Sequence, residues 1–348
     1  MIPFSELKID ALLVSALPNI RYLSGFTGSN ALLLVTPDSQ TLFTDPRYTI
    51  QASQECSCKV RTVKKGELER SAVQVITRRR LKRIGFESSR MFHEAYRRLK
   101  EEVALGVSLK PTTGVIERLR MIKTPEEIER IRRSVLTNSQ AFDKTLASIR
   151  PGISEFEIAS RLEFEMRQLG AEKTAFETIV AAGAHAALPH AQPSDRKVAT
   201  NELLLIDMGA CQDGYMSDMT RTVSVGKTSP AARKMYNSVL RAQLTALEAV
   251  RPGITAGKVD RKARQVLDSE GLGKAFSHST GHGLGLEIHE PPRLGRGEKT
   301  RLEAGMVITI EPGAYVRDVG GVRIEDTVLV TKTGCEVLTP TTKELILL

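Results

Sequence analysis

Short apolar runs separated by turn-forming residues dominate the first third of the chain. Such runs occupy residues 11–14, 31–35, 41–44 and 83–87, and Pro, Gly and Asn residues divide them. Runs of this length between turn signals predict buried strands, and the helical patterns near residues 46–54, 67–82 and 91–104 predict helices between them. This alternation of strands and helices predicts a small α/β domain over residues 1–118.

A second domain is predicted to begin with a long helix. Thr124 can cap this helix, Pro125 suits its first position, and Glu127 completes a capping box. Ser154 and Glu157 form the same pattern before a later helix. We place the domain boundary just before the first of these helices and assign residues 119–348 to the second domain.

The second domain repeats itself. Arg150-Pro-Gly-Ile153 recurs as Arg251-Pro-Gly-Ile254, each copy between two helical stretches, and glycines follow the later helices at positions 170 and 271. Further matches follow in the same order: His185 and His190 with His282 and His289, Asp207 with Glu311, and Asp218 with Glu325. The series predicts two copies of one fold unit, related by a pseudo-two-fold axis.

Each half ends an apolar run in a carboxylate. Residues 203–206 lead to Asp207, and residues 307–310 lead to Glu311. Turn signals near residues 212–214 and 318–321 lie close to the midpoints between these acids and Asp218 and Glu325. Because positions equidistant from a hairpin turn face each other, we expect one facing carboxylate pair from each half. Two-fold packing of the halves would bring the two pairs together.

Four carboxylates in one pocket require positive charge. At about 4 Å and an effective dielectric of about 20, each like-charged pair costs about 4 kcal/mol. A shared proton would relieve one pair, whereas two divalent cations would neutralise all four charges and create a hydrolytic centre. Oxygen ligands with one imidazole favour Mn²⁺, Co²⁺, Fe²⁺ or Zn²⁺. Three of the six histidines lie in one glycine-rich segment: His278, His282 and His289.

Composition and charge exclude several other classes of protein. The chain has 348 residues with 41% apolar and 26% charged residues, and no run resembles a membrane span or a secretory signal, which favours a cytoplasmic protein. Cys56 and Cys58 are too close for the usual zinc pair, so free thiols are expected. The net charge is +9, but Trp is absent and aromatic residues make up only 5%, so the basic clusters at 78–83 and 130–133 indicate solvated helix faces rather than a nucleic-acid surface.

Motifs in both domains resemble the pita-bread metallopeptidases, which include methionine aminopeptidase, Xaa-Pro aminopeptidase and Xaa-Pro dipeptidase (prolidase). The first domain resembles the creatinase-type N-terminal domain of the proline-specific members, through residues 19–28 and 44–48. The matching segments of the second domain are Ile206-Asp-Met-Gly-Ala210, Tyr215-Met-Ser-Asp218-Met-Thr-Arg221-Thr, Thr280-Gly-His282-Gly-Leu-Gly-Leu-Glu-Ile-His289-Glu, Thr309-Ile-Glu311-Pro-Gly-Ala-Tyr315 and Gly321-Val-Arg323-Ile-Glu325-Asp. The resemblance implies an α/β (α+β) protein with a creatinase-type domain followed by a pita-bread domain.

The resemblance also implies a role for each matching residue. It implies two divalent ions held by Asp207, Asp218, His282, Glu311 and Glu325. We expect Mn²⁺, with Co²⁺, Zn²⁺ or Fe²⁺ as alternatives. Asp218 and Glu325 would bridge the ions around a hydroxide nucleophile, and Glu311 would carry its proton. His190 and His289 would bind the substrate carbonyl and the developing oxyanion. His278 would line the pocket, Tyr315 would lie at its edge, and Arg323 would hold Glu325 by a charge-assisted bond.

The creatinase-type domain favours hydrolysis of the bond that precedes proline, a tertiary amide without an N–H. Arg293 resembles the carboxylate anchor of short prolidases, which favours an Xaa-Pro dipeptidase over an Xaa-Pro aminopeptidase acting on longer peptides. A non-catalytic binding module and a metal-free enzyme of the creatinase kind are further alternatives, and the intact ligand set opposes both. The expected partners are a small peptide with proline in second position and a second copy of the chain, with no nucleic acid and no membrane. The preferred first residue stays open.

Overall fold

The computed structural model describes residues 2–348, which form two compact units, one ending at Arg120 and the other spanning Met121–Leu348. A six-stranded sheet with strand order β4-β3-β2-β1-β5-β6 forms the centre of the N-terminal unit. Its strands are β1 (Ala11–Val14), β2 (Ala31–Val35), β3 (Gln40–Thr44), β4 (Lys59–Thr62), β5 (Arg83–Glu87) and β6 (Ser108–Thr112). The helices are α1 (Phe4–Leu7), α2 (Leu17–Ser24), α3 (Thr49–Glu55), α4 (Leu68–Arg78), α5 (His93–Glu102) and α6 (Val115–Arg120), with the 3₁₀ turn η1 (Pro46–Tyr48).

The apolar runs of the N-terminal unit are the central strands of its sheet. In β1, Leu12 and Val14 pack into one hydrophobic cluster, whereas Ala11 and Leu13 pack into another, so both faces of the strand are buried. The four predicted strands and the helices near residues 46–54, 67–82 and 91–104 are therefore confirmed. Strands β4 and β6 were not predicted, because they are edge strands with several exposed positions and lack continuous apolar runs.

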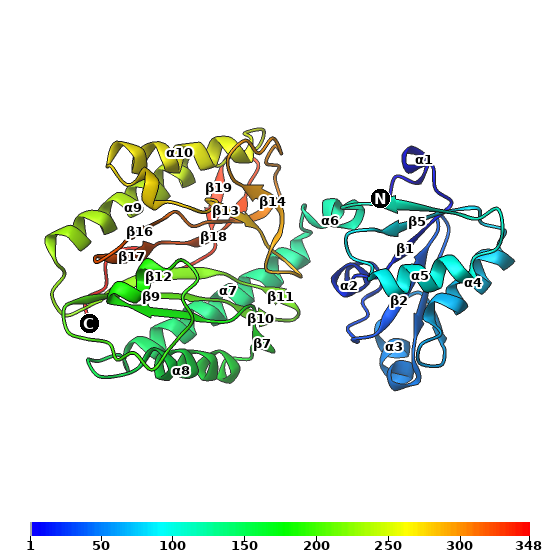
Figure 1. The fold of residues 1–348 in the computed structure, drawn as a ribbon, viewed down its shortest axis with the longest axis horizontal. Coiled ribbons are helices and arrows are strands. Elements are labelled where there is room, and N and C mark those ends of the chain that lie inside the picture. Colours follow the sequence, from blue (N-terminus) through cyan, green and yellow to red (C-terminus); the bar gives the residue numbers. More distant parts are fainter. Residues whose placement is uncertain (1) are drawn as a thin grey trace. The chain divides into compact units, whose positions relative to one another are not determined.

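Two pairs of helices enclose the strands of the C-terminal unit (Figure 1). The pairs are α7 (Pro125–Leu146) with α8 (Glu155–Gln168), and α9 (Pro230–Ala249) with α10 (Ala256–Ser269). Both predicted capping boxes form, at Thr124 and at Ser154. The repeated Arg-Pro-Gly-Ile motif connects the two helices of each pair, and its glycines, Gly152 and Gly253, have φ angles of 91° and 84°. The recurrence therefore has a structural reason, because each copy makes a turn that needs a left-handed residue.

The strands between the helix pairs form several small sheets. The first half contributes β7 (Lys173–Thr174), β8 (Ile179–Ala182), the 3₁₀ turn η2 (Gly183–Ala187), β9 (Glu202–Met208), β10 (Ala210–Gln212), β11 (Tyr215–Met216) and β12 (Met219–Val225). The second half contributes the 3₁₀ turn η3 (Gly273–Ala275), β13 (Gly281–Gly283), β14 (Glu290–Leu294), β15 (Val307–Ile310), β16 (Gly313–Val316), β17 (Gly320–Arg323), β18 (Asp326–Val330) and β19 (Cys335–Val337). One hydrophobic core lies under α7 and α8, and a larger one lies under α9 and α10.

Hydrogen bonds around the start of β12 join the two halves. The Glu325 N–H donates to the Thr220 carbonyl at 3.1 Å, and the Thr220 hydroxyl donates to Glu325 Oε2 at 2.7 Å. The Thr327 hydroxyl donates to the Asp218 carbonyl at 2.8 Å. These bonds place the acidic strand ends of one half against those of the other.

The predicted pairing of the acids is correct in one half and wrong in the other. Ile310 pairs with Asp326 and Gly313 with Arg323, a register that puts Glu311 opposite Glu325. In the first half, however, Asp207 pairs with Thr220 rather than with Asp218. The turn is centred on Asp213 and Gly214, one residue later than expected, which shifts the pairing by two positions. Asp218 still shares a face with Thr220, because side chains two positions apart point the same way.

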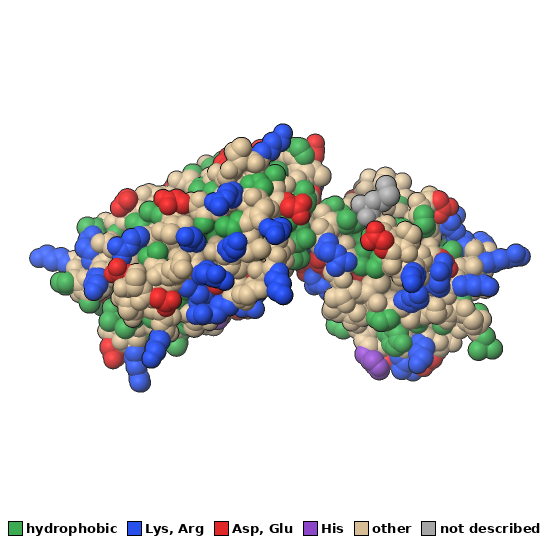
Figure 2. Space-filling model, turned by 90° about the horizontal axis from the view of Figure 1, so that it is seen from above, with side chains coloured by type: hydrophobic (Ala, Val, Ile, Leu, Met, Phe, Trp, Pro, Cys, Tyr) green, Lys and Arg blue, Asp and Glu red, His purple; other side chains and the backbone are tan. Residues whose placement is uncertain are grey.

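Several residues of the two basic clusters form ion pairs with acids on the surface. Arg79 and Arg83 bind Asp38 and Asp10, and Arg132 binds Glu336. On the face drawn in Figure 2, the Lys and Arg side chains of the C-terminal unit are interspersed with acidic and apolar side chains. Arg132 lies on α7, as expected for a solvated helix face, whereas Arg79 follows the end of α4 and Arg83 lies in β5, so the first cluster is only partly helical. Within residues 2–348, every helix is too short or too polar to cross a membrane.

Candidate metal centre

The acidic strand ends and one histidine meet in a cavity of about 840 Å³ within the C-terminal unit. Asp218, His282 and Glu325 each offer a ligand atom, and these atoms all lie within 4.8 Å of one another. His282 Nε2 lies 3.4 Å from Glu311 Oε1, and Asp207 lines the same cavity. The fold thus brings together five side chains that are far apart in the sequence.

Close packing around β13 fixes the position of His282. A Cβ atom on Gly281 would lie 2.0 Å from the Thr309 carbonyl oxygen, and one on Gly283 would lie 2.3 Å from the Pro291 carbonyl oxygen. Glycine is therefore required on both sides of His282. The ring nitrogen Nδ1 lies 3.0 Å from the Gly283 carbonyl oxygen, which favours a proton on Nδ1 and leaves Nε2 free to bind a cation.

Burial and mutual repulsion raise the pKa values of these carboxyl groups. The pKa values of Asp218 and Glu325 lie well above their usual range, because burial disfavours the charged form and neighbouring carboxylates add to the effect. Burial also raises the pKa of Glu311. Asp207 Oδ1 and Glu325 Oε1 are buried without any hydrogen-bond partner among the described residues. Unpartnered buried oxygens in a crowd of carboxylates fit a centre that holds divalent cations.

Arg323 binds Asp207, not Glu325 as the family resemblance implied. Its Nη2 donates to Asp207 Oδ2, and its Nε donates to the Thr220 hydroxyl at 3.0 Å. That hydroxyl in turn donates to Glu325, so Arg323 reaches Glu325 only through Thr220. The prediction of a direct bond from Arg323 to Glu325 is therefore wrong, because the guanidinium extends from the second half of the unit to Asp207 in the first half.

Tyr315 connects Arg323 to one of the histidines. Arg323 Nη1 donates to the Tyr315 hydroxyl at 2.6 Å, and that oxygen lies 2.9 Å from His278 Nε2. Burial raises the pKa of Tyr315 to about 12, so the phenol is neutral. Burial and the Arg323 charge lower the pKa of His278 to about 4, so its ring is neutral as well. Tyr315 supports the cavity wall through these contacts and is not itself among the residues that line the cavity.

Two further histidines line the cavity. The His289 ring lies 4.4 Å from the His282 ring, centroid to centroid, and burial together with His282 lowers the pKa of His289. A neutral His289 has one ring N–H to donate. His190 lies on the loop after η2 and, like His289, is exposed. The carbonyl of its neighbour Pro189 accepts a hydrogen bond from Arg323 at 3.2 Å, which ties this loop to the centre.

The sequence did not single out Glu155, which holds the loop that carries His190. Its buried carboxylate accepts hydrogen bonds from the backbone N–H groups of Ala182 and Ser194, at 2.8 and 3.1 Å. His185 Nδ1 lies 2.9 Å from the same carboxylate. Glu155 therefore fixes both ends and the middle of the loop. Its position beside the capping Ser154 was the only signal, and it indicated no more than a helix start.

Arg293 lies at the mouth of the cavity. It pairs with His282 across strands β13 and β14, so the fold places a cation next to the candidate ligand. Its Nε donates to the Ser279 hydroxyl at 2.6 Å, which leaves its terminal nitrogens available. The side chain is exposed and lines the cavity.

Comparisons with known proteins found a matching family model for each of the two units. The model of metallopeptidase family M24 matches residues 129–332, and that of the creatinase/prolidase N-terminal domain matches residues 4–122. An Xaa-Pro dipeptidase of Pyrococcus horikoshii is 40% identical over 340 residues, which cover 97% of this chain and 95% of that protein. The solved structure of an Xaa-Pro dipeptidase from Bacillus anthracis has a TM-score of 0.96 and 38% identity, with coverage of 99% and 97%. That of an X-Pro aminopeptidase from Thermotoga maritima has a TM-score of 0.92 and 36% identity, with coverage of 99% of both chains.

Proposed function

The chain belongs to metallopeptidase family M24, and we propose that it hydrolyses the peptide bond that precedes proline, with Xaa-Pro dipeptides as its main substrates. The observation that carries the proposal is the cluster of four carboxylates and one imidazole in a single cavity, with two buried oxygens unpartnered. The near full-length similarity to Xaa-Pro dipeptidases gives the substrate class.

The proposed ligand set for two divalent ions combines the acids of both halves with His282: Asp207, Asp218, His282, Glu311 and Glu325. Such a pair of ions supplies an activated water and polarises a carbonyl. The oxygen-rich set favours Mn²⁺, with Co²⁺, Fe²⁺ and Zn²⁺ as alternatives. Arg323 holds one oxygen of Asp207 and, through Thr220, one oxygen of Glu325, while the other oxygen of each carboxylate is buried without a hydrogen-bond partner among the described residues.

The other residues of the cavity bind and orient the substrate in this proposal. Glu311 accepts the proton of the attacking water, because its carboxylate lies in the metal cavity, 3.4 Å from His282 Nε2, and so beside the position of that water. His289 and His190 donate hydrogen bonds to the scissile carbonyl and to the negative charge that develops on its oxygen. None of these contacts needs an N–H at the scissile nitrogen, which proline lacks.

Arg293 favours a dipeptide over a longer peptide. In an Xaa-Pro dipeptide the free carboxylate lies on the proline itself, and the terminal nitrogens of Arg293 can bind it at the cavity mouth. Xaa-Pro aminopeptidase activity on longer peptides is a second candidate, supported by the similarity to the Thermotoga maritima enzyme.

A homodimer and a cytoplasmic location complete the proposal. The dimer rests on the family resemblance alone. The four cysteines are all free thiols in the structure, which accords with a reducing compartment.

One assay tests the proposed function. The chelated protein is supplied with Mn²⁺, Co²⁺ or Zn²⁺, and the release of alanine is measured from Ala-Pro and from Ala-Pro-Ala. We expect metal-dependent cleavage with a higher kcat/KM on Ala-Pro. Cleavage mainly of Ala-Pro-Ala would favour the aminopeptidase, and no cleavage of either peptide with any metal would overturn the proposal.

A further inference from the structure

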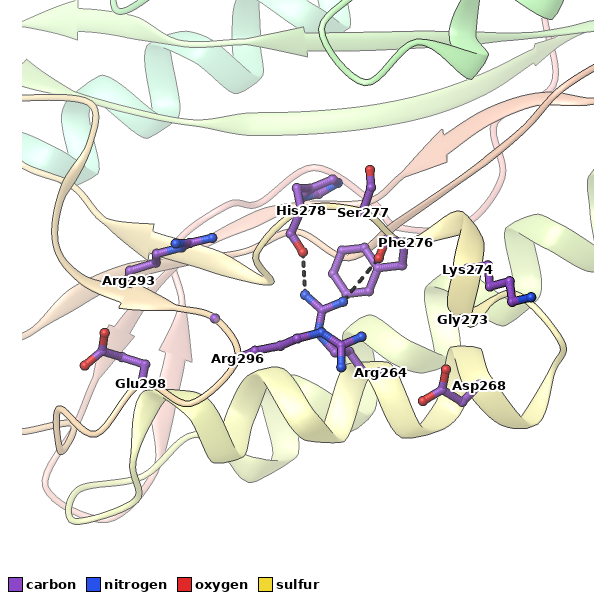
Figure 3. Close-up of a pocket in the computed structure, with 11 residues that line it drawn as sticks. Arg264, Asp268, Gly273, Lys274, Phe276, Ser277, His278, Arg293, Arg296 and Glu298 are labelled. Carbon is purple, nitrogen blue, oxygen red and sulfur yellow. Dashed lines mark hydrogen bonds between the residues drawn. The ribbon is translucent and has the colours of Figure 1, made fainter.

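A second cavity, of about 660 Å³, lies beside the metal cavity. The two cavities share His278, Arg293 and Glu298 as lining residues, so Arg293 stands between them. Figure 3 shows the second cavity between α10, the segment after η3 and the loop that follows β14. A substrate longer than a dipeptide has room to continue into this space.

The charges of the metal cavity orient the substrate toward the second cavity. Among the described residues, two arginines and no lysine line the metal cavity, namely Arg293 and Arg323. Arg323 is buried and donates hydrogen bonds to Asp207 and Tyr315. Arg293 is exposed, and its terminal nitrogens are available to a ligand. The carboxyl-terminal side of a bound peptide is therefore directed to Arg293. A residue after proline extends the chain by about 3.5 Å and would pass Arg293 into the second cavity.

Basic side chains line the second cavity beyond Arg293. The guanidinium of Arg264 already has partners within the protein, because it pairs with Asp260 and donates hydrogen bonds to the carbonyls of Phe276 and His278. Lys274 and Arg296 are exposed, and neither side chain has a hydrogen bond or an ion pair with any of the residues 2–348. Two cations of this cavity are thus available to a ligand.

The carboxylates of the second cavity do not neutralise these two cations by direct contact. Glu298 Oε1 accepts hydrogen bonds from the Thr300 hydroxyl and from the N–H groups of Lys299 and Thr300. Asp268 packs against Gly273, where an added Cβ atom would lie 1.7 Å from its carboxylate oxygen. The cavity therefore presents two positively charged side chains without an ion pair and favours an anionic ligand.

We propose that the second cavity binds the residue that follows proline in Xaa-Pro-Yaa peptides and selects for an acidic side chain at that position through Lys274 and Arg296. The inference rests on the proposed function, since it extends the substrate of the same metal centre. Both cations are exposed, so their contribution is modest and sensitive to salt. We expect a preference of about three- to tenfold in kcat/KM for Ala-Pro-Glu over Ala-Pro-Gln at low ionic strength.

The experiment compares three peptides, Ala-Pro, Ala-Pro-Gln and Ala-Pro-Glu, on the Mn²⁺-loaded full chain. The variants are R296Q, K274Q and the double variant, with K262Q as control. Lys262 is an exposed lysine on α10 that does not line the cavity, so K262Q removes the same charge from the same region. We expect the double variant to cleave Ala-Pro-Glu and Ala-Pro-Gln equally well, and K262Q to keep the wild-type preference.

Each outcome separates this inference from the proposed function. Cleavage of Ala-Pro by the double variant at the wild-type rate would show that the metal centre is intact while the selectivity is lost. Equal kcat/KM of the wild-type protein on Ala-Pro-Glu and Ala-Pro-Gln, or no cleavage of either tripeptide beside rapid cleavage of Ala-Pro, would overturn the inference and leave the proposed function standing. Failure on all three peptides would instead overturn the proposed function.

Discussion

The Arg323 guanidinium donates a hydrogen bond to the Asp207 carboxylate across the join between the two halves of the C-terminal unit. Both side chains belong to the buried part of the candidate metal centre, and Arg323 also binds Thr220 and Tyr315. The raised pKa of Arg323, which its anionic neighbours cause against the opposing effect of burial, keeps the guanidinium charged. This cation partly balances the carboxylates and fixes the orientation of one of them.

Replacing Arg323 by lysine should weaken the metal centre without removing the charge. Lysine lacks the planar fork that reaches Asp207, Thr220 and Tyr315 together. We expect metal affinity or kcat/KM to fall about 10- to 100-fold, the usual cost of losing a contact that orients a ligand. Calorimetric Mn²⁺ titration and the Ala-Pro assay measure the two quantities. R132K is the matched control, because Arg132 forms a surface ion pair with Glu336; equal losses in both variants would contradict the assigned role.

Divalent metal should stabilise the protein through His282. Binding to the native state alone adds about 2.7 kcal/mol to the free energy of unfolding at 100 times Kd. We therefore expect Mn²⁺ to raise the Tm of the chelated wild-type protein and to raise that of H282A much less. H93A serves as control, since His93 is an exposed residue of α5. A Tm increase in H282A as large as that in the wild-type protein would exclude His282 as a ligand.

Arg293 should act on substrate binding rather than on chemistry. In R293Q the proline carboxylate loses its cation, so we expect KM for Ala-Pro to rise about tenfold with little change in kcat. Ala-prolinamide has no carboxylate, and its kcat/KM should be the same for R293Q and the wild-type protein. K299Q removes a neighbouring exposed charge and should leave both substrates unaffected. An equal loss of kcat/KM on Ala-Pro and Ala-prolinamide would show that Arg293 does not bind the substrate carboxylate.

Glu155 should position the loop that carries His190. In E155Q an NH₂ group replaces one of the two carboxylate oxygens that accept hydrogen bonds from backbone N–H groups. The loop therefore loses its hydrogen bond at Ala182 or at Ser194. We expect kcat to fall about tenfold, because a small displacement of a substrate-binding group is costly, while Mn²⁺ content stays at the wild-type level. Glu157, two residues further along α8, belongs to the capping box instead. E157Q should therefore reduce the Tm slightly and leave kcat unchanged; a kcat loss equal to that of E155Q would contradict the assigned role.

Glu87 should make the stability of the protein depend on pH. Its buried carboxylate accepts hydrogen bonds from the N–H groups of Ser15 and Ala16 and from the Asn19 amide, yet burial raises its pKa. A pKa that is higher in the native than in the unfolded state gives stability that is present below the unfolded value, about 4.3, and lost as pH rises through the native pKa.

The measurement compares Tm at about pH 5 and about pH 7 for the wild-type protein and E87Q. The glutamine does not titrate, so the decrease in Tm between the two pH values should be larger for the wild-type protein. Comparing each protein with itself cancels any constant effect of the substitution on stability. Identical pH dependence in the two proteins would show that Glu87 does not titrate in this range.

Much of the fold followed from local features of the chain. The apolar runs of residues 11–14 and 31–35 are strands because strands buried on both faces need continuous apolar sequence. Thr124 and Ser154 start helices because their side chains satisfy backbone N–H groups only a few residues away. The edge strands β4 and β6 were not predicted, because an exposed strand does not need a continuous run of apolar side chains.

The sequence by itself determined the candidate ligands, since carboxylates at the ends of apolar strands and a histidine between glycines signal a buried polar centre wherever they fold. Only the tertiary structure decided the partners of these residues. The pairing of Asp207 with Thr220, the bond from Arg323 to Asp207 and the anchoring of the His190 loop by Glu155 all depend on hairpin register and on contacts between distant segments. A shift of one residue at a turn moves every partner along the strand, and spacing in the sequence does not fix such a shift.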